Sequence, residues 1–337
     1  MTPEELSAAG YPFSPHWYTH RSGARQHYLD EGAGEPVILL HGNPTWSYCW
    51  RHLIHGLRGT YRCIAPDHIG MGLSGRPDER RHPYSAMQRL TDLQILTDHL
   101  IQERGVADQG WTLVAHDWGG TIGMALARRN PGLVRRLVLL NTVAFPWPHD
   151  YRLPLPLRLI RNHQWAARMV HRSNAFVKAA ARRGVTQPLP AEVRRAYSAP
   201  YRKARHRLAV VRFVQDIPVH PSDPSWPLVE GAEKEVAALA ELPAFIGWGD
   251  KDPVFTETLL REWQRRLPKA QVHRYPQAGH FVMEDAGRAL IPAIQDFLAA
   301  TPPAGQTDAP RHVPTTGNRE RPETLLRAPH RSGGEPQ

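Results

Sequence analysis

The chain has 337 residues, of which 41% are apolar, and its formal net charge at pH 7 is +10. This length accommodates one large domain with an insertion, and no apolar run approaches the roughly 20 residues that span a bilayer. The N-terminal segment carries Glu4 and Glu5 and has no apolar centre, unlike a signal peptide, so we expect a cytoplasmic protein. The two cysteines, Cys49 and Cys63, are too few for a disulfide scaffold and are expected in the core.

The first hundred residues alternate between strand and helix patterns. Short apolar, β-prone runs bounded by turn residues predict strands, and longer periodic runs predict helices. The predicted strands are 16–20, 26–29, 36–42 and 61–66, and the predicted helices are 48–57 and 85–104. Such alternation favours a mostly parallel sheet with helices on both faces.

The chain is organised around residues 111–121. An apolar strand ends at Asp117, and a helical pattern follows over 121–129 until Pro131 stops it. The small residues Ala115, Gly119 and Gly120 leave room for a sharp turn, which is the pattern of a nucleophile elbow with aspartate in place of serine. A carboxylate needs no base for deprotonation and can displace a leaving group from saturated carbon. The alternative is a strand that ends in a helix-capping aspartate.

After a strand at 135–141 the alternation stops. Residues 145–232 are helical and interrupted by prolines, without an obvious strand, and strands resume at 244–249 and 271–275 before a last helix at 290–299. We therefore predict a hydrolase-type core at 1–145 and 233–300, a helical cap at 146–232 and a disordered tail at 301–337. We assign four apolar cap residues mainly to the cap core, with a share in the roof of a pocket: Trp165, Met169, Phe176 and Phe213.

The predicted cap is strongly basic. Glu192 is the only acid between residues 151 and 214, among many arginines. Such a block suits an acidic partner, an anionic membrane surface or an anionic product, and it is equally compatible with solvated helix faces. No nucleic-acid-binding motif accompanies the charge, so we expect no nucleic-acid partner.

Two further loops complete a catalytic arrangement. Asp252 follows the strand 244–249, and His280 follows the strand 271–275, so the chain order is nucleophile, acid, histidine, as in an α/β-hydrolase triad. Asp252 is preferred to Asp250 because it stands third after Gly249 and directly before a proline. The loop that begins at Asn141 carries no carboxylate that could replace it.

A cradle for a leaving group is expected beside Asp117. Backbone N–H groups near Asn43 and Trp118, together with the Asn43 amide and the Trp118 indole, would supply its donors. No metal ligand set and no cofactor motif is found. The alternative for Trp118 is core packing.

His-Asp-Trp-Gly-Gly at 116–120, together with residues 41–51, resembles the haloalkane dehalogenase family of α/β-hydrolases. The resemblance implies that Asp117 is the nucleophile, His280 the base and Asp252 its acid, with Asn43 and Trp118 binding halide. Epoxide hydrolases share the first element and use two cap tyrosines, for which the candidates are Tyr151, Tyr197 and Tyr201.

A wider match, over about residues 10–300, involves the segments 67–74, 194–201, 212–218 and 244–249. These are similar to the β-lactone decarboxylase branch of bacterial long-chain olefin biosynthesis. The resemblance implies a hydrophobic substrate, a cis-3,4-dialkyl β-lactone, that gives a cis-alkene and carbon dioxide, without a cofactor. The basic charge of the cap suggests that it could attach such an enzyme to other enzymes of the pathway or to a membrane surface. Haloalkane hydrolysis is the first alternative, and a non-enzymatic receptor on a hydrolase scaffold is another.

Overall fold

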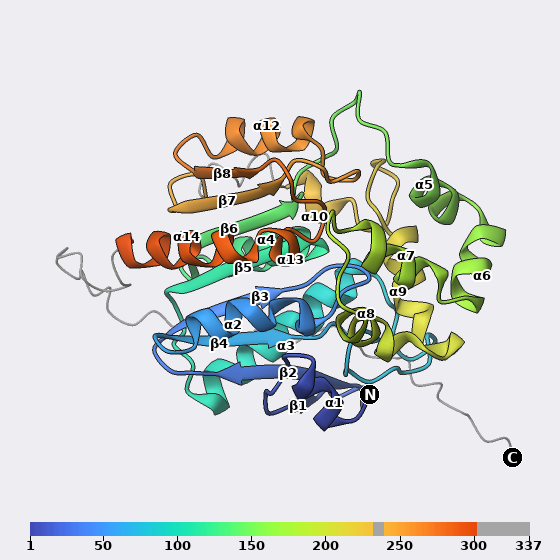
Figure 1. Ribbon diagram of the computed structural model, residues 1–337, viewed down its shortest axis with the longest axis horizontal. Coiled ribbons are helices and arrows are strands. Elements are labelled where there is room, and N and C mark those ends of the chain that lie inside the picture. The colour runs from blue at the N-terminus through green and yellow to red at the C-terminus, as the bar shows by residue number, and fades with distance from the viewer. Residues whose placement is uncertain (232–238, 302–337) are drawn as a thin grey trace, which may run out of the picture. The chain divides into compact units, whose positions relative to one another are not determined.

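One eight-stranded sheet forms the centre of the chain, in the order β1-β2-β4-β3-β5-β6-β7-β8 (Figure 1). The computed structural model describes residues 1–231 and 239–301. The strands are β1 (His16–Thr19), β2 (Arg25–Glu31), β3 (Glu35–Leu40), β4 (Tyr61–Pro66), β5 (Trp111–Asp117), β6 (Val134–Thr142), β7 (Ala244–Gly249) and β8 (Gln271–Tyr275). The pairs β1·β2 and β2·β4 are antiparallel and the other five are parallel. The predicted mostly parallel sheet is confirmed.

The parallel strands bring their carboxyl ends to one edge of the sheet. Leu40 at the end of β3 pairs with Ala115 of β5, and Asp117 pairs with Thr142 of β6. Every residue of β5 is buried, which explains its near-continuous apolar sequence, as expected for a strand covered on both faces. Loops that follow β3, β5, β6, β7 and β8 therefore meet at the same edge.

Helices cover both faces of the sheet (Figure 1). On one face α2 (Arg51–Leu57), which follows the 3₁₀ helix η1 (Ser47–Trp50), packs against α14 (Gly287–Ala300), and on the other α3 (Ala86–Arg104) packs against α4 (Trp118–Arg129). The Ser85 hydroxyl caps α3 by accepting the N–H of Gln88, and Gly105 ends it in the left-handed conformation.

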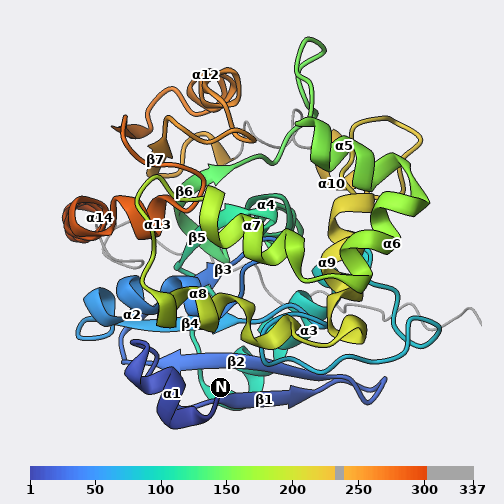
Figure 2. The same cartoon turned by 45° about the vertical axis from the view of Figure 1, so that its right-hand side comes forward.

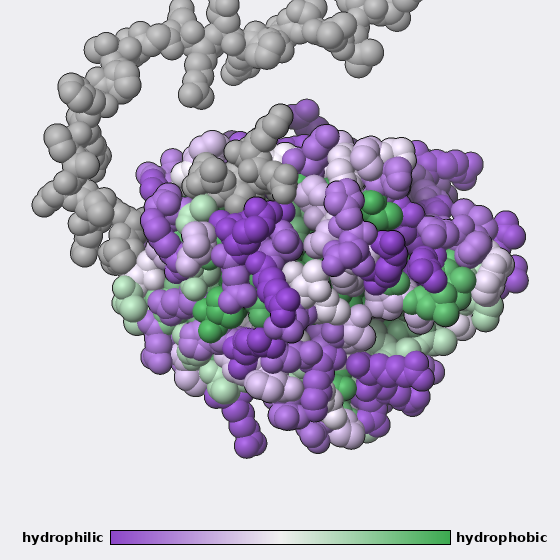
Figure 3. Space-filling view, turned by 90° about the horizontal axis from the view of Figure 1, so that it is seen from above, coloured by the Kyte–Doolittle hydropathy of each residue, from purple (hydrophilic) through white to green (hydrophobic). Residues whose placement is uncertain are grey.

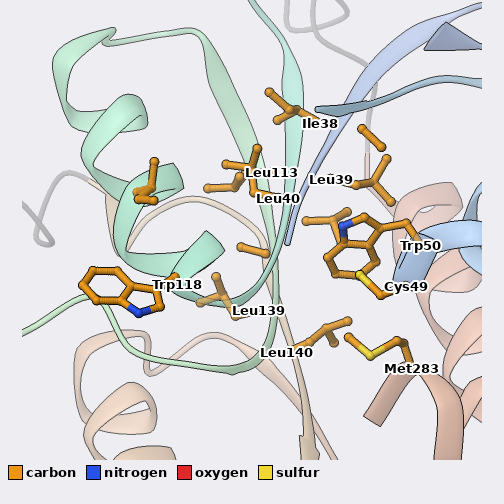
Figure 4. Close-up of a cluster of buried hydrophobic side chains, with 14 of the residues drawn as sticks. Ile38, Leu39, Leu40, Cys49, Trp50, Leu113, Trp118, Leu139, Leu140 and Met283 are labelled. Carbon is orange, nitrogen blue, oxygen red and sulfur yellow. The ribbon is translucent and has the colours of Figure 1, made fainter. Parts of the chain in front are cut away.

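The core between these layers is apolar and closely packed (Figure 4). Leu39, Leu40 and Trp50 are fully buried, and each such side chain contributes about 1.5–3 kcal/mol to stability. Cys49 and Cys63 are buried free thiols, as predicted.

A group of helices separates β6 from β7 and lies beyond the carboxyl ends of these strands (Figures 1 and 2). It comprises α5 (Leu155–Asn162), α6 (Gln164–Arg172), α7 (Ala175–Arg183), α8 (Ala191–Ser198), η2 (Ala199–Tyr201), η3 (Ala204–Arg207), α9 (Leu208–Gln215) and α10 (Pro227–Glu230). Between β6 and β7 the described residues contain no strand. We call this insertion the cap. Its predicted end at residue 232 and the predicted tail after residue 301 lie outside the described residues.

A buried ion pair attaches the cap to the core. Arg51 of α2 donates two hydrogen bonds to Glu284, at 2.5 and 2.9 Å, and the Tyr197 hydroxyl of α8 donates to the same carboxylate at 2.5 Å. Both members of the ion pair are almost fully buried, so loss of one partner would leave a desolvated charge.

Three short helices were not predicted: α1 (Pro3–Ala8), α12 (Glu257–Arg266) and α13 (Val282–Asp285). A capping box between Thr2 and Glu5 was available as a signal for α1. No helix of the described residues has both the length and the apolar composition needed to cross a membrane.

Candidate active site

Asp117 stands at a strained turn between β5 and α4. Its φ of +53° is uncommon for a residue with a side chain and costs of order 1–3 kcal/mol. The turn requires glycine next to it, because a Cβ on Gly119 would lie 2.0 Å from the Leu40 carbonyl oxygen and one on Gly120 1.9 Å from Thr142 Oγ1. The Thr142 hydroxyl donates to the Asp117 carbonyl at 2.5 Å. The side chain is thereby projected from the edge of the sheet.

The Asp117 carboxylate is desolvated and held by backbone donors. The N–H of Asn43 donates to Oδ1 at 2.7 Å. Burial raises the pKa of Asp117, and this outweighs the charge of His280 and the N–H groups of Trp118 and Asn43, which favour the carboxylate. Oδ2 lies 3.8 Å from His280 Nε2. One oxygen is therefore fixed and the other faces His280.

His280 is oriented by Asp252. Its Nδ1–H donates to Asp252 Oδ2 at 2.8 Å, and since an ionised carboxylate only accepts, Nε2 is the nitrogen left to face Asp117. Burial lowers the pKa of His280, but the charges of Asp252 and Asp117 and this hydrogen bond outweigh it, so the pKa is raised. Asp252 Oδ1 accepts the N–H groups of Val254 and Phe255, at 2.7 and 3.0 Å.

Asp250 points elsewhere. It pairs at 3.0 Å with Arg274, whose side chain is 47% exposed. The structure thus places Asp252 beside the histidine and Asp250 in a surface ion pair.

Asn141 and His116 support this arrangement and were not predicted. Asn141 donates from Nδ2 to Asp252 Oδ2 at 3.0 Å and to the Gly249 carbonyl at 3.1 Å, and its Oδ1 accepts the Gly249 N–H. His116 Nε2 bonds the His280 carbonyl at 2.9 Å, and burial holds the pKa of His116 well below its usual range, so the ring is neutral and donates. The only sequence signal for either was a polar residue at the end of an apolar run in its strand.

A buried polar network holds the loop that presents Asn43. The Asp67 carboxylate accepts hydrogen bonds from Ser47 N, Leu73 N and His27 Nδ1, at 2.7–2.9 Å. His41 accepts the His68 N–H at Nε2 and bonds the Gly42 carbonyl through Nδ1. Burial lowers the pKa of His41, which keeps the ring neutral in this role.

Asn43 and Trp118 flank the carboxylate. One N–H of the Asn43 amide donates to the Val210 carbonyl in the cap at 3.1 Å, so only the second is free for a ligand. The Trp118 indole N–H has no hydrogen-bond partner among the described residues, and its ring packs 5.2 Å from that of Phe213. Figure 4 shows the Trp118 indole at one side of the cluster of buried apolar side chains. Two free N–H donors thus remain near Asp117.

A cavity of about 250 Å³ lies over this group. Asp117, His280, Asn43 and Trp118 contribute to its wall, which is otherwise mostly apolar and comes from the cap and from the loop after β7. Three wall residues are also exposed and mark the mouth: Pro156, Arg183 and Pro253. A polar reacting end with apolar surroundings suits a hydrophobic ligand.

The predicted roof is correct only in part. Phe176 lines the cavity, and Phe213 is fully buried behind Trp118. Trp165 and Met169 are 55% and 62% exposed and belong to neither the core nor the cavity wall. The helical pattern of α6 shows two opposite faces but does not indicate which of them the cap covers.

The three cap tyrosines are used elsewhere. Tyr151 donates to the Val254 carbonyl, Tyr197 to Glu284 and Tyr201 to the Thr45 carbonyl. None of the described residues that line the cavity is a tyrosine. This geometry does not favour epoxide opening by cap tyrosines.

Comparisons with known proteins identify the family and the fold. The family model described as the alpha/beta hydrolase fold matches residues 35–287. A cis-3-alkyl-4-alkyloxetan-2-one decarboxylase from Xanthomonas campestris pv. campestris is 43% identical, over 88% of this chain and 100% of the relative. One from Shewanella oneidensis is 42% identical, over 86% and 90%. The crystal structure of haloalkane dehalogenase DbeA from Bradyrhizobium elkani USDA94 superposes with a TM-score of 0.74 at 28% identity, over 86% and 100%.

These relatives confirm the resemblance drawn from the sequence, which extends through the cap. The family model, which matches most of the core, gives the same fold as the strand order and the sharp turn at Asp117. The chain belongs to the α/β-hydrolase family.

Proposed function

We propose that this protein converts cis-3,4-dialkyl β-lactones into cis-alkenes and carbon dioxide. The observation that carries the proposal is the Asp117 carboxylate in the wall of a mostly apolar cavity, with Oδ1 held by the Asn43 N–H and Oδ2 facing His280. The two relatives with 43% and 42% identity, both named for this reaction, support the choice of substrate. We place the reaction in long-chain olefin biosynthesis.

The first step is a displacement at saturated carbon. Asp117 Oδ2 attacks the ring carbon that bears the ring oxygen, a carbon–oxygen bond to Asp117 forms, and the bond between that carbon and the ring oxygen breaks. The released carboxylate is stabilised by the free N–H groups of Asn43 and Trp118. The attack inverts the configuration at this carbon.

The second step is an elimination. The bond between the carboxylate and its neighbouring carbon breaks, the electron pair forms the double bond, and Asp117 leaves as a carboxylate. Inversion followed by anti elimination retains the ring geometry, so a cis lactone gives a cis alkene. Attack at the lactone carbonyl, which gives a mixed anhydride with Asp117, is the rival first step.

In this scheme His280 takes no proton. Its raised pKa places a positive charge 3.8 Å from Asp117 Oδ2 below that pKa, and it steers the anionic groups of the reaction. Asp252 and Asn141 act through His280 and are positioning residues.

Haloalkane hydrolysis is the second candidate. The specific observation in its favour is the pair of free N–H donors on Asn43 and Trp118, which suits a halide as well as a carboxylate. Asp117 would form an alkyl ester, and His280 Nε2 would then activate a water that attacks the ester carbonyl.

Turnover of both substrate types distinguishes the candidates. Purified protein is incubated with a cis-β-lactone and, separately, with a haloalkane, while alkene and halide are measured side by side. Asp117→Ala serves as the control, with its fold checked by circular dichroism. We expect alkene from the wild type and none from the variant. Halide without alkene would support the second candidate, and alkene formation by Asp117→Ala at more than a few per cent of wild type would exclude a covalent intermediate.

A further inference from the structure

The outer face of α6 carries apolar and cationic side chains together. Trp165, Arg168, Met169 and Arg172 are spaced i, i+3, i+4 and i+7, so they share one face of the helix, and all four are exposed. Ala166 and Ala167 on the opposite face are buried. The face is therefore turned to solvent although two of its four side chains are apolar.

The neighbouring helix exposes side chains of the same two kinds. α5 packs against α6 and exposes Leu155 (56%) and Arg158. At the right-hand end of Figure 3, where Figure 1 places α5 and α6, green surface lies directly beside purple surface. We call these six residues the cap face: Leu155, Arg158, Trp165, Arg168, Met169 and Arg172.

Apolar exposure is concentrated on the cap face. Five large apolar residues are exposed in the described chain, and three of them belong to these two helices. The other two, Trp17 on β1 and Ile95 on α3, are isolated, and Arg25 lies over the Trp17 ring. A cluster of exposed apolar side chains on a folded protein indicates an interaction surface.

The positive charge of the cap face indicates that its partner is negatively charged. Its three arginines pair with no carboxylate of a described residue, and the chain from 151 to 214 offers only Glu192 as an acid. An anionic surface would therefore meet unneutralised cations.

We infer that the cap face binds the surface of an anionic lipid bilayer. Tryptophan lies preferentially at the level of the headgroups, and arginine can extend its guanidinium to phosphates while its stem stays in the apolar boundary. A bilayer offers both environments to a single convex helix face, and α6 supplies both within two turns. A protein partner would need a matching apolar patch ringed by acids, so the mixed spacing favours lipid.

The position of the cavity gives this surface a use, and this part rests on the proposed function. Pro156 of α5 belongs to the mouth of the cavity, next in sequence to Leu155. A cavity of about 250 Å³ is smaller than the 300–1,000 Å³ typical of sites for drug-sized ligands, so the chains of a long-chain lactone extend beyond it. A docked cap face would keep those chains in lipid while the ring reaches Asp117.

Vesicle flotation of the full chain tests the inference. The vesicles contain phosphatidylcholine, alone or with about one third phosphatidylglycerol. We expect binding only to the anionic vesicles, and weaker binding as the salt concentration rises from about 0.05 to 0.5 M, because the Debye length falls. Each arginine near such a surface contributes a factor of about five, so the triple change of Arg158, Arg168 and Arg172 to Gln should weaken binding about a hundredfold.

Two further variants separate the cap face from general effects. Leu155, Trp165 and Met169 changed together to Ser should weaken binding at least about tenfold through lost apolar contact. The charge control changes Arg21, Arg135 and Arg288 to Gln. These arginines are exposed, lie outside the cap and have no carboxylate partner among the described residues. The control therefore has the same net charge as the variant in which the three cap-face arginines are changed to Gln. The apolar control is Trp17→Ser with Ile95→Ser. Both controls should bind like the wild type.

The inference is overturned if the wild type fails to float at low salt, or if the charge control loses as much binding as the cap-face variant. Capture of an acidic protein that depends on the cap face, without vesicle binding, would assign the surface to a protein partner and also overturn it. Turnover of a short-chain lactone is measured in parallel and should be unchanged in every variant. If the wild type turns over no lactone, the proposed function fails, while flotation still decides the lipid surface.

Discussion

We predict that two isosteric changes two residues apart, Asp252→Asn and Asp250→Asn, differ widely in effect. Asp252 is 4% exposed, and both of its oxygens face hydrogen-bond donors. These donors are His280 Nδ1 and Asn141 Nδ2 at Oδ2, and the backbone N–H groups of Val254 and Phe255 at Oδ1.

An amide at position 252 must turn its NH₂ toward one of these donor pairs. The backbone N–H groups cannot change roles, so the NH₂ faces His280, whose Nδ1 must then become an acceptor. The ring shifts to the tautomer with the proton on Nε2, the nitrogen that faces Asp117, and it can no longer act there as a base. Such a change costs about 10⁴-fold in rate, or about 5 kcal/mol in activation free energy, for a step in which the histidine takes a proton.

The control lies in the surface ion pair. Asp250 pairs with the half-exposed Arg274, and such pairs contribute about 0.2–1 kcal/mol to stability, so Asp250→Asn should stay within about twofold of wild-type turnover. Asp252→Asn should lower halide release by about 10⁴-fold and alkene formation by much less. Both variants are compared by thermal melting, halide release and alkene formation. If the wild type releases no halide, the two variants are compared by alkene formation alone. Greater damage from Asp250→Asn would refute the placement of the acid.

Three further outcomes are expected. Halide release needs neutral His280, and the pKa of His280 is raised above its usual value of about 6.5. As the pH falls, halide release should therefore decline while the pH is still above 6.5, whereas alkene formation continues to lower pH. Coincident pH profiles for the two activities would contradict this. Asn141→Gly keeps the positive φ of 35° but removes the three hydrogen bonds of the Asn141 side chain. The free energy of unfolding should fall by about 1–3 kcal/mol, and turnover should fall by about tenfold. Unchanged turnover would show that Asp252 does not need the hydrogen bond from Asn141. Gly119→Ala should lose about 3 kcal/mol in denaturant melts, because its Cβ meets a backbone oxygen, while Gly59→Ala, with open space around its Cβ, should be neutral.

The positions of the three central residues could be predicted because a parallel sheet brings all its carboxyl ends together. Asp117, Asp252 and His280 each follow a strand that the sequence marks by β-prone apolar residues and turn residues, and the structure brings them together. Their catalytic roles remain proposals. The supporting residues Asn141 and His116 could not be found in this way, because their hydrogen bonds depend on which loops meet in space.

The cap was harder to interpret for a physical reason. A helix with apolar residues at i and i+4 has the same pattern whether that face meets the core or solvent, so Trp165 and Met169 were assigned to the core and are exposed. The helix α12 carries its three buried apolar residues, Leu259, Leu260 and Trp263, at helical spacing, so a usable signal for it was present in the sequence. Asn43 was expected to offer its amide to a ligand, and its bond to Val210 depends on where the cap rests.

The fate of water tests the central claim most directly. In the proposed decarboxylation the bond to Asp117 is broken by elimination, so no oxygen from solvent enters the carboxylate. In a dehalogenase, hydrolysis of the aspartyl ester replaces one Asp117 oxygen in each cycle. After many turnovers of a cis-β-lactone in ¹⁸O-water, the peptide that contains Asp117 is analysed by mass spectrometry, with haloalkane turnover as the positive control. We predict an unlabelled peptide with alkene as product; ¹⁸O in Asp117 during alkene formation would contradict the elimination mechanism.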